Sequence, residues 1–370
     1  MMKINCSKSD LVKGVNIVLK AVPTKTTMPI LECILIDATT DVIKLTANDM
    51  ELGIETVIEG NIIRRGMIAL NAKLFSEMVK KLPDSDVIIE APSDSLATIK
   101  SEKTIFNIAA HSGEDFSYLP DVEKGNNISL SEYTLKEIIN QTIFSISDSE
   151  TNKMMTGMLV EIAGNILQVV TLDGHRISIR KVELADEYPH QKVIVPGKTM
   201  DEIRRIIRGN VEDKIEISFT NNHILFEFDQ TTVVSRLIEG NYFNIEQMLS
   251  TDYETKIRVI KQDFLDCIER AMLLVREGDK KPIIIDIRDD VMDIKIKSQI
   301  ASLNEDITIL KDGKDLLIGF NPRFIVDALR AIDDEEVDLY FMNSKTPCFI
   351  RDLEETYIYL ILPVNFSSVG

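Results

Sequence analysis

Three segments of this chain resemble one another, and each begins 125 positions after the one before. They span residues 70–82, 195–207 and 320–332. Each carries a basic residue at the same place (Lys73, Lys198, Arg323), followed by apolar residues at helical spacing, a polar turn and a β-rich run. Solenoid repeats have periods of about 20–50 residues. The longer interval therefore indicates one domain that is present three times.

Each third of the chain also contains a second helical pattern. These patterns cover residues 9–20, 132–146 and 262–276, and a Ser, Thr or Asp near each start can cap a helix. Alternating β-branched runs predict half-buried antiparallel strands at 43–46, 57–63, 166–171, 192–195, 283–287 and 294–297. We therefore predict an α+β fold with three tandem domains at 1–124, 125–250 and 251–370, joined near 122–127 and 250–254.

Apolar runs and cysteine usage indicate the cellular compartment in which this chain works. The chain has no apolar run of 18 residues and no apolar segment of a signal peptide at its start. Its four cysteines (Cys6, Cys33, Cys267, Cys348) are scattered and form no C-x-x-C pair. These features favour a reducing cytoplasm, without a membrane, a metal or another cofactor.

Charge is distributed unevenly along the chain. The chain has a net charge of −18, whereas the six predicted helices sum to +6, which leaves −24 for the rest. Lys and Arg are good helix formers, so this distribution can be a simple consequence of helix propensity. Alternatively, the helices form one mildly basic surface that lies beside phosphates, without base-specific contacts. The candidates for such contact are Lys25, Lys73, Lys80, Lys153, Lys198, Arg204 and Arg205.

Repeated domains placed head to tail can close into a ring. Helices spaced about 9 Å apart on an inner wall give about 54 Å of circumference for six helices and about 108 Å for twelve. Twelve helices leave about 23 Å clear after a helix diameter of about 10–12 Å is subtracted. A duplex is about 20 Å across. Two chains, but not one, would therefore surround double-stranded DNA.

Two other functions fit parts of the sequence. An enzyme would centre its active site on Asp173, His175 and Arg176, although this spacing is poor for zinc and no nucleophile or phosphate-loop motif accompanies it. A sequence-specific nucleic-acid binder would bind a short linear duplex tightly and in a salt-sensitive way.

Several motifs, in this order and spacing, resemble the β subunit of bacterial DNA polymerase III, the replicative sliding clamp. They are Thr46-Ala-Asn-Asp-Met-Glu51, Phe116-Ser-Tyr-Leu-Pro120, Asp173-Gly-His-Arg176, Arg236-Leu-Ile-Glu-Gly240 and Tyr359-Leu-Ile-Leu-Pro-Val364. The resemblance covers essentially the whole chain. It implies a head-to-tail homodimeric ring with helices inside and antiparallel sheets outside, and a processivity factor with no catalytic site. Such a clamp encircles duplex DNA and tethers the replicative polymerase, the clamp loader and repair proteins through short hydrophobic peptides.

The resemblance also implies site residues. The peptide pocket would comprise Met155, Leu172, Gly174, His175, Arg176, Ile177, Met248, Ile361, Leu362, Pro363 and Val364. An apolar slot rich in Leu, Ile and Met suits Leu or Phe anchors from several partners. The dimer interface would comprise Phe106, Ile108, Leu273 and Leu274, although the apolar run at 272–274 also fits an ordinary core.

The sequence departs from the family pattern beside the pocket. Tyr242-Phe-Asn-Ile245 stands where the family usually has Phe-Pro-Asp-Tyr, and Asn365 replaces a frequent basic residue. These departures concern the peptide preference rather than the fold.

Overall fold

The computed structural model describes residues 1–116, 119, 127–149, 151–275 and 281–366. The chain forms two compact units, the first made of 1–135 with 201–237 and the second of 136–200 with 238–370. The chain passes from one unit to the other three times: within α3 (Glu132–Asn140), within α4 (Gly197–Ile206) and after Leu237.

The first unit is built on an antiparallel sheet of thirteen described strands, in the order β10-β13-β14-β15-β4-β3-β2-β6-β9-β8-β7-β1-β5. Along the chain these are β1 (Met2–Ser7), β2 (Cys33–Asp37), β3 (Ile43–Asn48), β4 (Leu52–Ile58), β5 (Asn61–Arg64), β6 (Met67–Asn71), β7 (Asp86–Ser93), β8 (Leu96–Ser101), β9 (Thr104–Ser112), β10 (Asn127–Ser131), β13 (Lys214–Phe219), β14 (His223–Phe228) and β15 (Thr231–Arg236). Strand β15 of the second repeat pairs with β4 of the first, with Thr231 opposite Thr56. The sheet therefore runs across the predicted boundary between the first two repeats.

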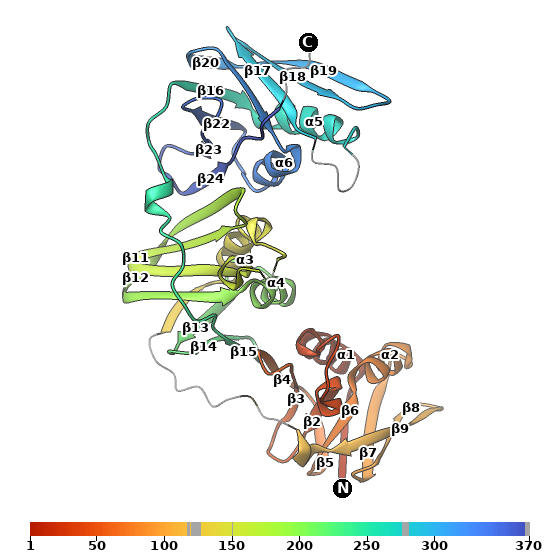
Figure 1. Cartoon of the computed structure of the whole chain (residues 1–370). Helices are drawn as coiled ribbons and strands as arrows, with labels where there is room; N and C mark the ends of the chain where they lie inside the picture. Colours follow the sequence, from red (N-terminus) through yellow and green to blue (C-terminus); the bar gives the residue numbers. More distant parts are fainter. Residues whose placement is uncertain (117–118, 120–126, 150, 276–280, 367–370) are drawn as a thin grey trace. The chain divides into compact units, whose positions relative to one another are not determined.

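Two helices lie side by side against this sheet, α1 (Lys8–Val18) and α2 (Ala72–Lys81) (Figure 1). Each begins at a polar cap: the Ser7 Oγ accepts the Asp10 N–H at 3.0 Å, and the Asn71 Oδ1 accepts the Leu74 N–H at 3.1 Å. The apolar face of each helix is buried in the core, as the helical spacing predicts.

The second unit contains a seven-stranded sheet, β11-β12-β24-β23-β22-β16-β20, and a four-stranded sheet, β19-β18-β17-β21, both counted over the described residues. Their strands are β11 (Gly157–Leu172), β12 (Arg176–Pro196), β16 (Thr255–Ile260), β17 (Ile283–Arg288), β18 (Val291–Lys297), β19 (Ser302–Thr308), β20 (Leu310–Gly313), β21 (Leu316–Phe320), β22 (Glu336–Phe341), β23 (Cys348–Arg351) and β24 (Tyr357–Ile361). Strand β12 of the second repeat pairs with β24 of the third, with Arg176 opposite Ile361. This sheet also crosses a predicted repeat boundary.

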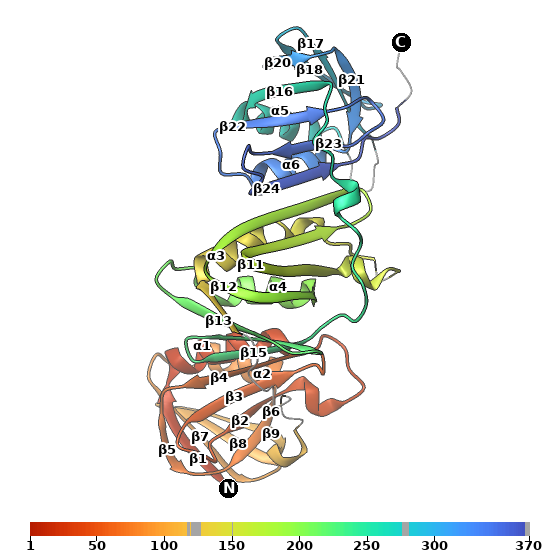
Figure 2. The same ribbon diagram turned by 90° about the vertical axis from the view of Figure 1, so that its left-hand side faces the viewer.

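Helices α5 (Lys261–Met272) and α6 (Pro322–Arg330) lie side by side in the second unit, as both ribbon views show (Figures 1 and 2). The Asn321 side chain caps α6 by accepting the Arg323 N–H at 3.0 Å. Phe264 and Ile268 of α5 and Ile325 and Leu329 of α6 are buried in one apolar core. None of the helices in the described ranges is long and apolar enough to span a bilayer.

All six predicted helices are present, but the second helix predicted in each third of the chain ends earlier than predicted. The helix predicted over 132–146 stops at Asn140, and a 3-10 turn follows at Ile143–Ser145. The Thr142 Oγ1 donates to the Ile138 carbonyl oxygen at 2.6 Å, which is a local hydrogen bond typical of a helix end. Helix α1 stops at Val18, before the 3-10 turn Leu19–Ala21, and α5 stops at Met272. Residue 276 lies outside the described residues.

The strand predicted over 57–63 is two strands. Strand β4 ends at Ile58, and β5 begins at Asn61 and pairs with β1 instead. Gly60 permits this turn, because a Cβ there would lie 2.8 Å from the Asn5 carbonyl oxygen. The other predicted runs lie within observed strands.

Two other predictions fall partly on residues that the structure does not describe. In the motif at 116–120 only Phe116 and Leu119 are described, and in the join at 122–127 only Asn127. The three-domain boundaries stay a prediction, since the compact units follow the continuous sheets rather than the repeats.

Candidate functional site

The Asp-Gly-His-Arg motif forms the turn between β11 and β12. Gly174 has a φ of +87°, a conformation that L side chains rarely adopt. The Asp173 Oδ1 accepts the N–H of His175 at 2.9 Å and that of Arg176 at 3.2 Å. The carboxylate thus fixes the turn and presents the His175 side chain at its tip.

Arg176 connects this turn to α6. Its Nε donates to the Asp173 Oδ2 at 3.0 Å, and its Nη1 donates to the Asp327 Oδ2 at 2.6 Å. Its Nη2 donates to the Phe144 carbonyl oxygen, and its guanidinium lies 4.4 Å from the Phe324 ring centre. The side chain is only 10% exposed. Arg176 is therefore a structural link, and both Asp173 oxygens serve to position it and the turn rather than to move a proton.

The C-terminal end of the chain lies beside the same turn. The Leu362 N–H donates to the His175 carbonyl oxygen at 2.9 Å, and the Val364 N–H donates to the Gly319 carbonyl oxygen at 2.8 Å. The His175 ring stacks on Phe324, with ring centres 6.1 Å apart. The structure thus brings residues 174–177 and 361–364 together, as the resemblance implies.

An apolar surface, which we call the β12–β24 patch, lies next to this turn. Its buried floor contains Leu172, Ile177 and Leu360, and Met155, Tyr242, Phe243 and Leu249 pack against it partly buried. At its edge, Met248 is 43% exposed and Leu362 is 38% exposed. Partly exposed apolar side chains over a buried apolar floor form a suitable surface for Leu or Phe side chains of a partner.

Four patch residues were missed from the sequence, and one predicted residue lies elsewhere. The missed residues are Leu360, Tyr242, Phe243 and Leu249. Ile361 belongs to the core around α5 and α6, whereas Leu360 belongs to the patch. Successive strand residues face opposite sides of a sheet, so the alternation along β24 was the signal that could have found Leu360. Tyr242 is the missed residue with a polar group. Its hydroxyl donates to the Val170 carbonyl oxygen at 3.4 Å, and burial raises its pKa well above the usual range.

Val364 borders a second hollow. This groove has a volume of about 570 Å³, and its walls include Leu316, Met342, Lys345 and Phe366. Asn365 also lines it. The departures near the end of the chain therefore alter this groove rather than the floor of the β12–β24 patch.

The predicted DNA-proximal residues fall into two groups. Lys25, Lys73 and Lys80 of the first unit are exposed, and the described residues provide no ion pair for them. Arg204 and Arg205 of α4, in contrast, pair with Asp201 at 2.6 and 2.5 Å. Their charge is largely compensated within the helix, so the lysines of α2 are the stronger candidates. Lys153 and Lys198 are exposed in the second unit.

The predicted interface residues differ in exposure. Ile108 is buried within its own unit, and Phe106 is half-buried. Leu274 packs partly buried against the third repeat's core, whereas Leu273 is 83% exposed. Ile105 was not predicted and is 59% exposed. Strand β9 pairs with β8 over Thr104–Ala109 and with β6 only from Ala110 onward, so one edge of 104–109 has no neighbouring strand among the described ones.

Comparison with known proteins gives three consecutive family matches. Residues 2–120, 129–244 and 246–365 match the N-terminal, central and C-terminal domains of the DNA polymerase III beta subunit. The chain belongs to the DNA polymerase III beta subunit family. This confirms the resemblance and the α+β fold of three tandem clamp domains.

Individual relatives match this chain over their full length. The beta sliding clamp of Staphylococcus aureus is 34% identical, and the match covers 99% of this chain and 100% of the relative. A crystal structure of a putative DNA polymerase III beta subunit from Eubacterium rectale is 62% identical, with a TM-score of 0.97 over 99% of this chain and 100% of that one. The DNA polymerase sliding clamp of Bacillus subtilis is 33% identical, with a TM-score of 0.95 and the same coverage.

Proposed function

We propose that this chain is a DNA sliding clamp, a homodimeric ring that encircles duplex DNA and confers processivity on the replicative polymerase. The observation that carries this function is the full-length match of three tandem clamp domains. The family acts as a processivity factor without catalytic activity, so the Asp173–His175–Arg176 turn has no reaction to perform. We expect the clamp to act in the cytoplasm, on DNA of any sequence. The proposed domains are 1–124, 125–250 and 251–370.

A processivity assay tests this function directly. The purified chain, with its polymerase and clamp loader, is expected to lengthen the products made on a primed circular template in a single binding event. Product lengths that do not change when the chain is added would contradict the proposal.

The proposed partner site is the β12–β24 patch with the 173–177 turn. Polymerase, clamp loader and repair proteins would each insert Leu or Phe side chains of a short peptide there. Support comes from the exposed Leu362 and Met248 above a buried apolar floor. Methionine is flexible and leucine is apolar, so one surface can repack for several partners.

Binding of a fluorescent peptide with Leu and Phe anchors tests this site. Leu362→Asp is expected to weaken binding at least about tenfold, because it places a charge in an apolar contact. Leu353→Asp is the matched control, since Leu353 is 80% exposed in the turn between β23 and β24, at the other end of β24. Equal affinity of the two variants would rule out the patch as the peptide site.

The proposed dimer contact joins β9 of one copy to the third repeat of a second copy. Strand β9 offers a free edge over 104–109, and β19 is an edge strand of the four-stranded sheet. An unpaired strand edge readily adds another strand. The exposed Ile105 and Leu273 supply the apolar surface beside such edges. Two copies joined head to tail at both ends close a ring.

A further inference from the structure

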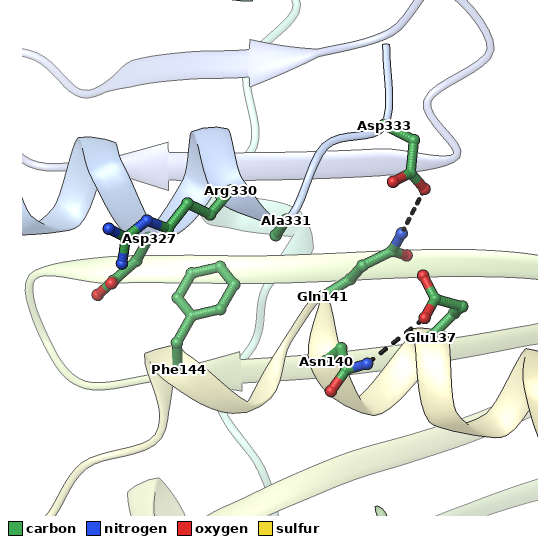
Figure 3. Close-up of a pocket in the computed structure, with 8 residues that line it drawn as sticks. All are labelled: Glu137, Asn140, Gln141, Phe144, Asp327, Arg330, Ala331 and Asp333. Atoms are coloured by element: carbon green, nitrogen blue, oxygen red, sulfur yellow. Dashed lines mark hydrogen bonds between the residues drawn. The ribbon is translucent and has the colours of Figure 1, made fainter. Parts of the chain in front are cut away.

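A cavity of about 410 Å³ lies where the C-terminal ends of α3 and α6 approach each other in the second unit. Figure 3 shows the eight side chains around it. They are Glu137, Asn140, Gln141, Phe144, Asp327, Arg330, Ala331 and Asp333. Asp327 and Phe144 also hold Arg176 of the 173–177 turn, whereas the clamp function described above gives the other six side chains no role.

Two of the three carboxylates in this cavity have no cationic partner among the residues that the structure describes. Asp327 is paired with Arg176 at 2.6 Å, and Arg330 donates to the Glu269 Oε1 at 2.8 Å. Glu137 and Asp333, by contrast, accept only long amide hydrogen bonds of 3.4 Å, from Asn140 and Gln141. Within the described parts of the chain no Lys, Arg or His forms an ion pair with either. The cavity therefore has an excess of negative charge.

Gln141 adds an independent sign of a missing donor. Its side chain is nine-tenths buried, at 7% exposure, and its Nε2 points to Asp333. Its Oε1 is buried and receives no hydrogen bond. Figure 3 shows the amide between the carboxylates of Asp333 and Glu137. Turning the amide over would only move the problem, because its oxygen would then face Asp333. A buried acceptor without a donor costs about 1–3 kcal/mol.

We propose that this cavity binds an alkylguanidinium group. A guanidinium carries a positive charge and five N–H donors in a planar fork, which suits two carboxylates and an amide oxygen that lie close together. The Phe144 ring supplies an aromatic wall for a cation of this kind. A metal ion fits less well, since the described residues contain no group of three or more His, Cys, Asp or Glu side chains that could hold one. The inference does not depend on the clamp function.

Such a group has two sources, an arginine side chain of another protein or a free small guanidinium compound. The shared chemistry is the guanidinium, and two probes separate the sources. N-acetylarginine amide represents the protein side chain, and n-butylguanidinium, which also carries one positive charge, represents the free cation. Tighter binding of the first identifies a protein partner, tighter binding of the second a free compound, and either supports the site.

The methyl group of Ala331 lines the cavity and provides a local reporter. In the full chain labelled at alanine methyl groups, titration with each probe is expected to shift the Ala331 signal in a saturable manner. Glu137→Gln and Asp333→Asn are each expected to weaken the better probe about fivefold, since each removes one ion pair. Asp84→Asn is the matched control, because it removes the same charge at an exposed position outside the cavity.

Three results would overturn the proposal. The first is an Ala331 signal that shifts with neither probe. The second is a result in which Asp84→Asn weakens binding of the probe as much as the cavity variants do. The third is binding of n-butylammonium as tight as that of both guanidinium probes. Unchanged positions of the remaining alanine signals in each variant establish that the fold is intact, so each comparison decides for or against the site.

Discussion

Arg176 is the residue on which the 173–177 turn most depends. Its guanidinium holds Asp173, Asp327 and the Phe144 carbonyl oxygen while its own side chain is almost buried. The turn that carries His175 is therefore connected to α6 by one side chain. Removal of that side chain would leave two partly buried carboxylates without their counterion.

Arg176→Met is expected to destabilise the second unit by about 3 kcal/mol, because it leaves these charges unpaired. The measurement is the midpoint of the urea-induced unfolding transition that reports on this unit. Arg288→Met is the control, since Arg288 is exposed and, among the described residues, pairs only with Asp286, so no resolvable shift of the midpoint is expected. Similar losses for the two variants would show that Arg176 is not a structural link.

Asp338 makes the stability of the folded state depend on pH. Burial raises its pKa, but hydrogen bonds and charge from Arg258 and Lys256 outweigh burial and hold the pKa below the usual range. A lowered pKa in the folded state means that the folded protein binds this proton less readily than the unfolded chain. The stabilisation is therefore present above the unfolded value of about 3.9 and is lost as the pH falls through the lower folded value. Asp338→Asn is expected to be less stable than the wild type at pH 7 and to approach it in stability below about pH 4. A difference in stability that does not change with pH would contradict this assignment.

At the scale of elements, helix α2 presents the clearest basic surface. Lys73 and Lys80 are exposed, and no described carboxylate pairs with them. If they contact phosphates, each contributes about 0.9 to the salt dependence of DNA binding. The double variant Lys73→Gln with Lys80→Gln is expected to lower the slope of log K against log salt by about 1.8. Lys103→Gln, in the turn between β8 and β9, is the control. An unchanged slope in the double variant would place α2 away from DNA.

The helices, the strands and the three repeats were predictable from the sequence, because apolar periodicity indicates the elements and the constant interval between similar segments indicates the repeats. Helix ends were not, because local hydrogen bonds such as that of Thr142 decide them. Pairing between repeats, as between β15 and β4, depends on tertiary contact and leaves no local pattern. For the same reason the Arg176–Asp327 pair, which joins residues 151 positions apart, could not be found from the motif alone. The turn at 173–177 and the C-terminal strand lie side by side, and their role as a peptide pocket stays a prediction. Strand alternation would have indicated that Leu360 faces the patch.

At the scale of the whole molecule, a closed ring requires two copies of the chain. Leu273→Asp is expected to shift the chain from a dimer to a monomer of 41.8 kDa in sedimentation equilibrium, because a charge replaces an exposed apolar contact. Leu353→Asp, at a similarly exposed leucine in the turn between β23 and β24, is expected to stay dimeric. If both variants were monomers, or if both were dimers, the assignment of Leu273 to the interface would be contradicted.

The central claim is that retention on DNA is mechanical rather than adhesive. Its most direct test measures how long the loaded protein stays on a nicked circular duplex before and after the circle is cut once. At a salt concentration that suppresses electrostatic binding, the account predicts a long residence on the circle and rapid loss from the linear molecule. Equal residence times on the two forms would contradict it.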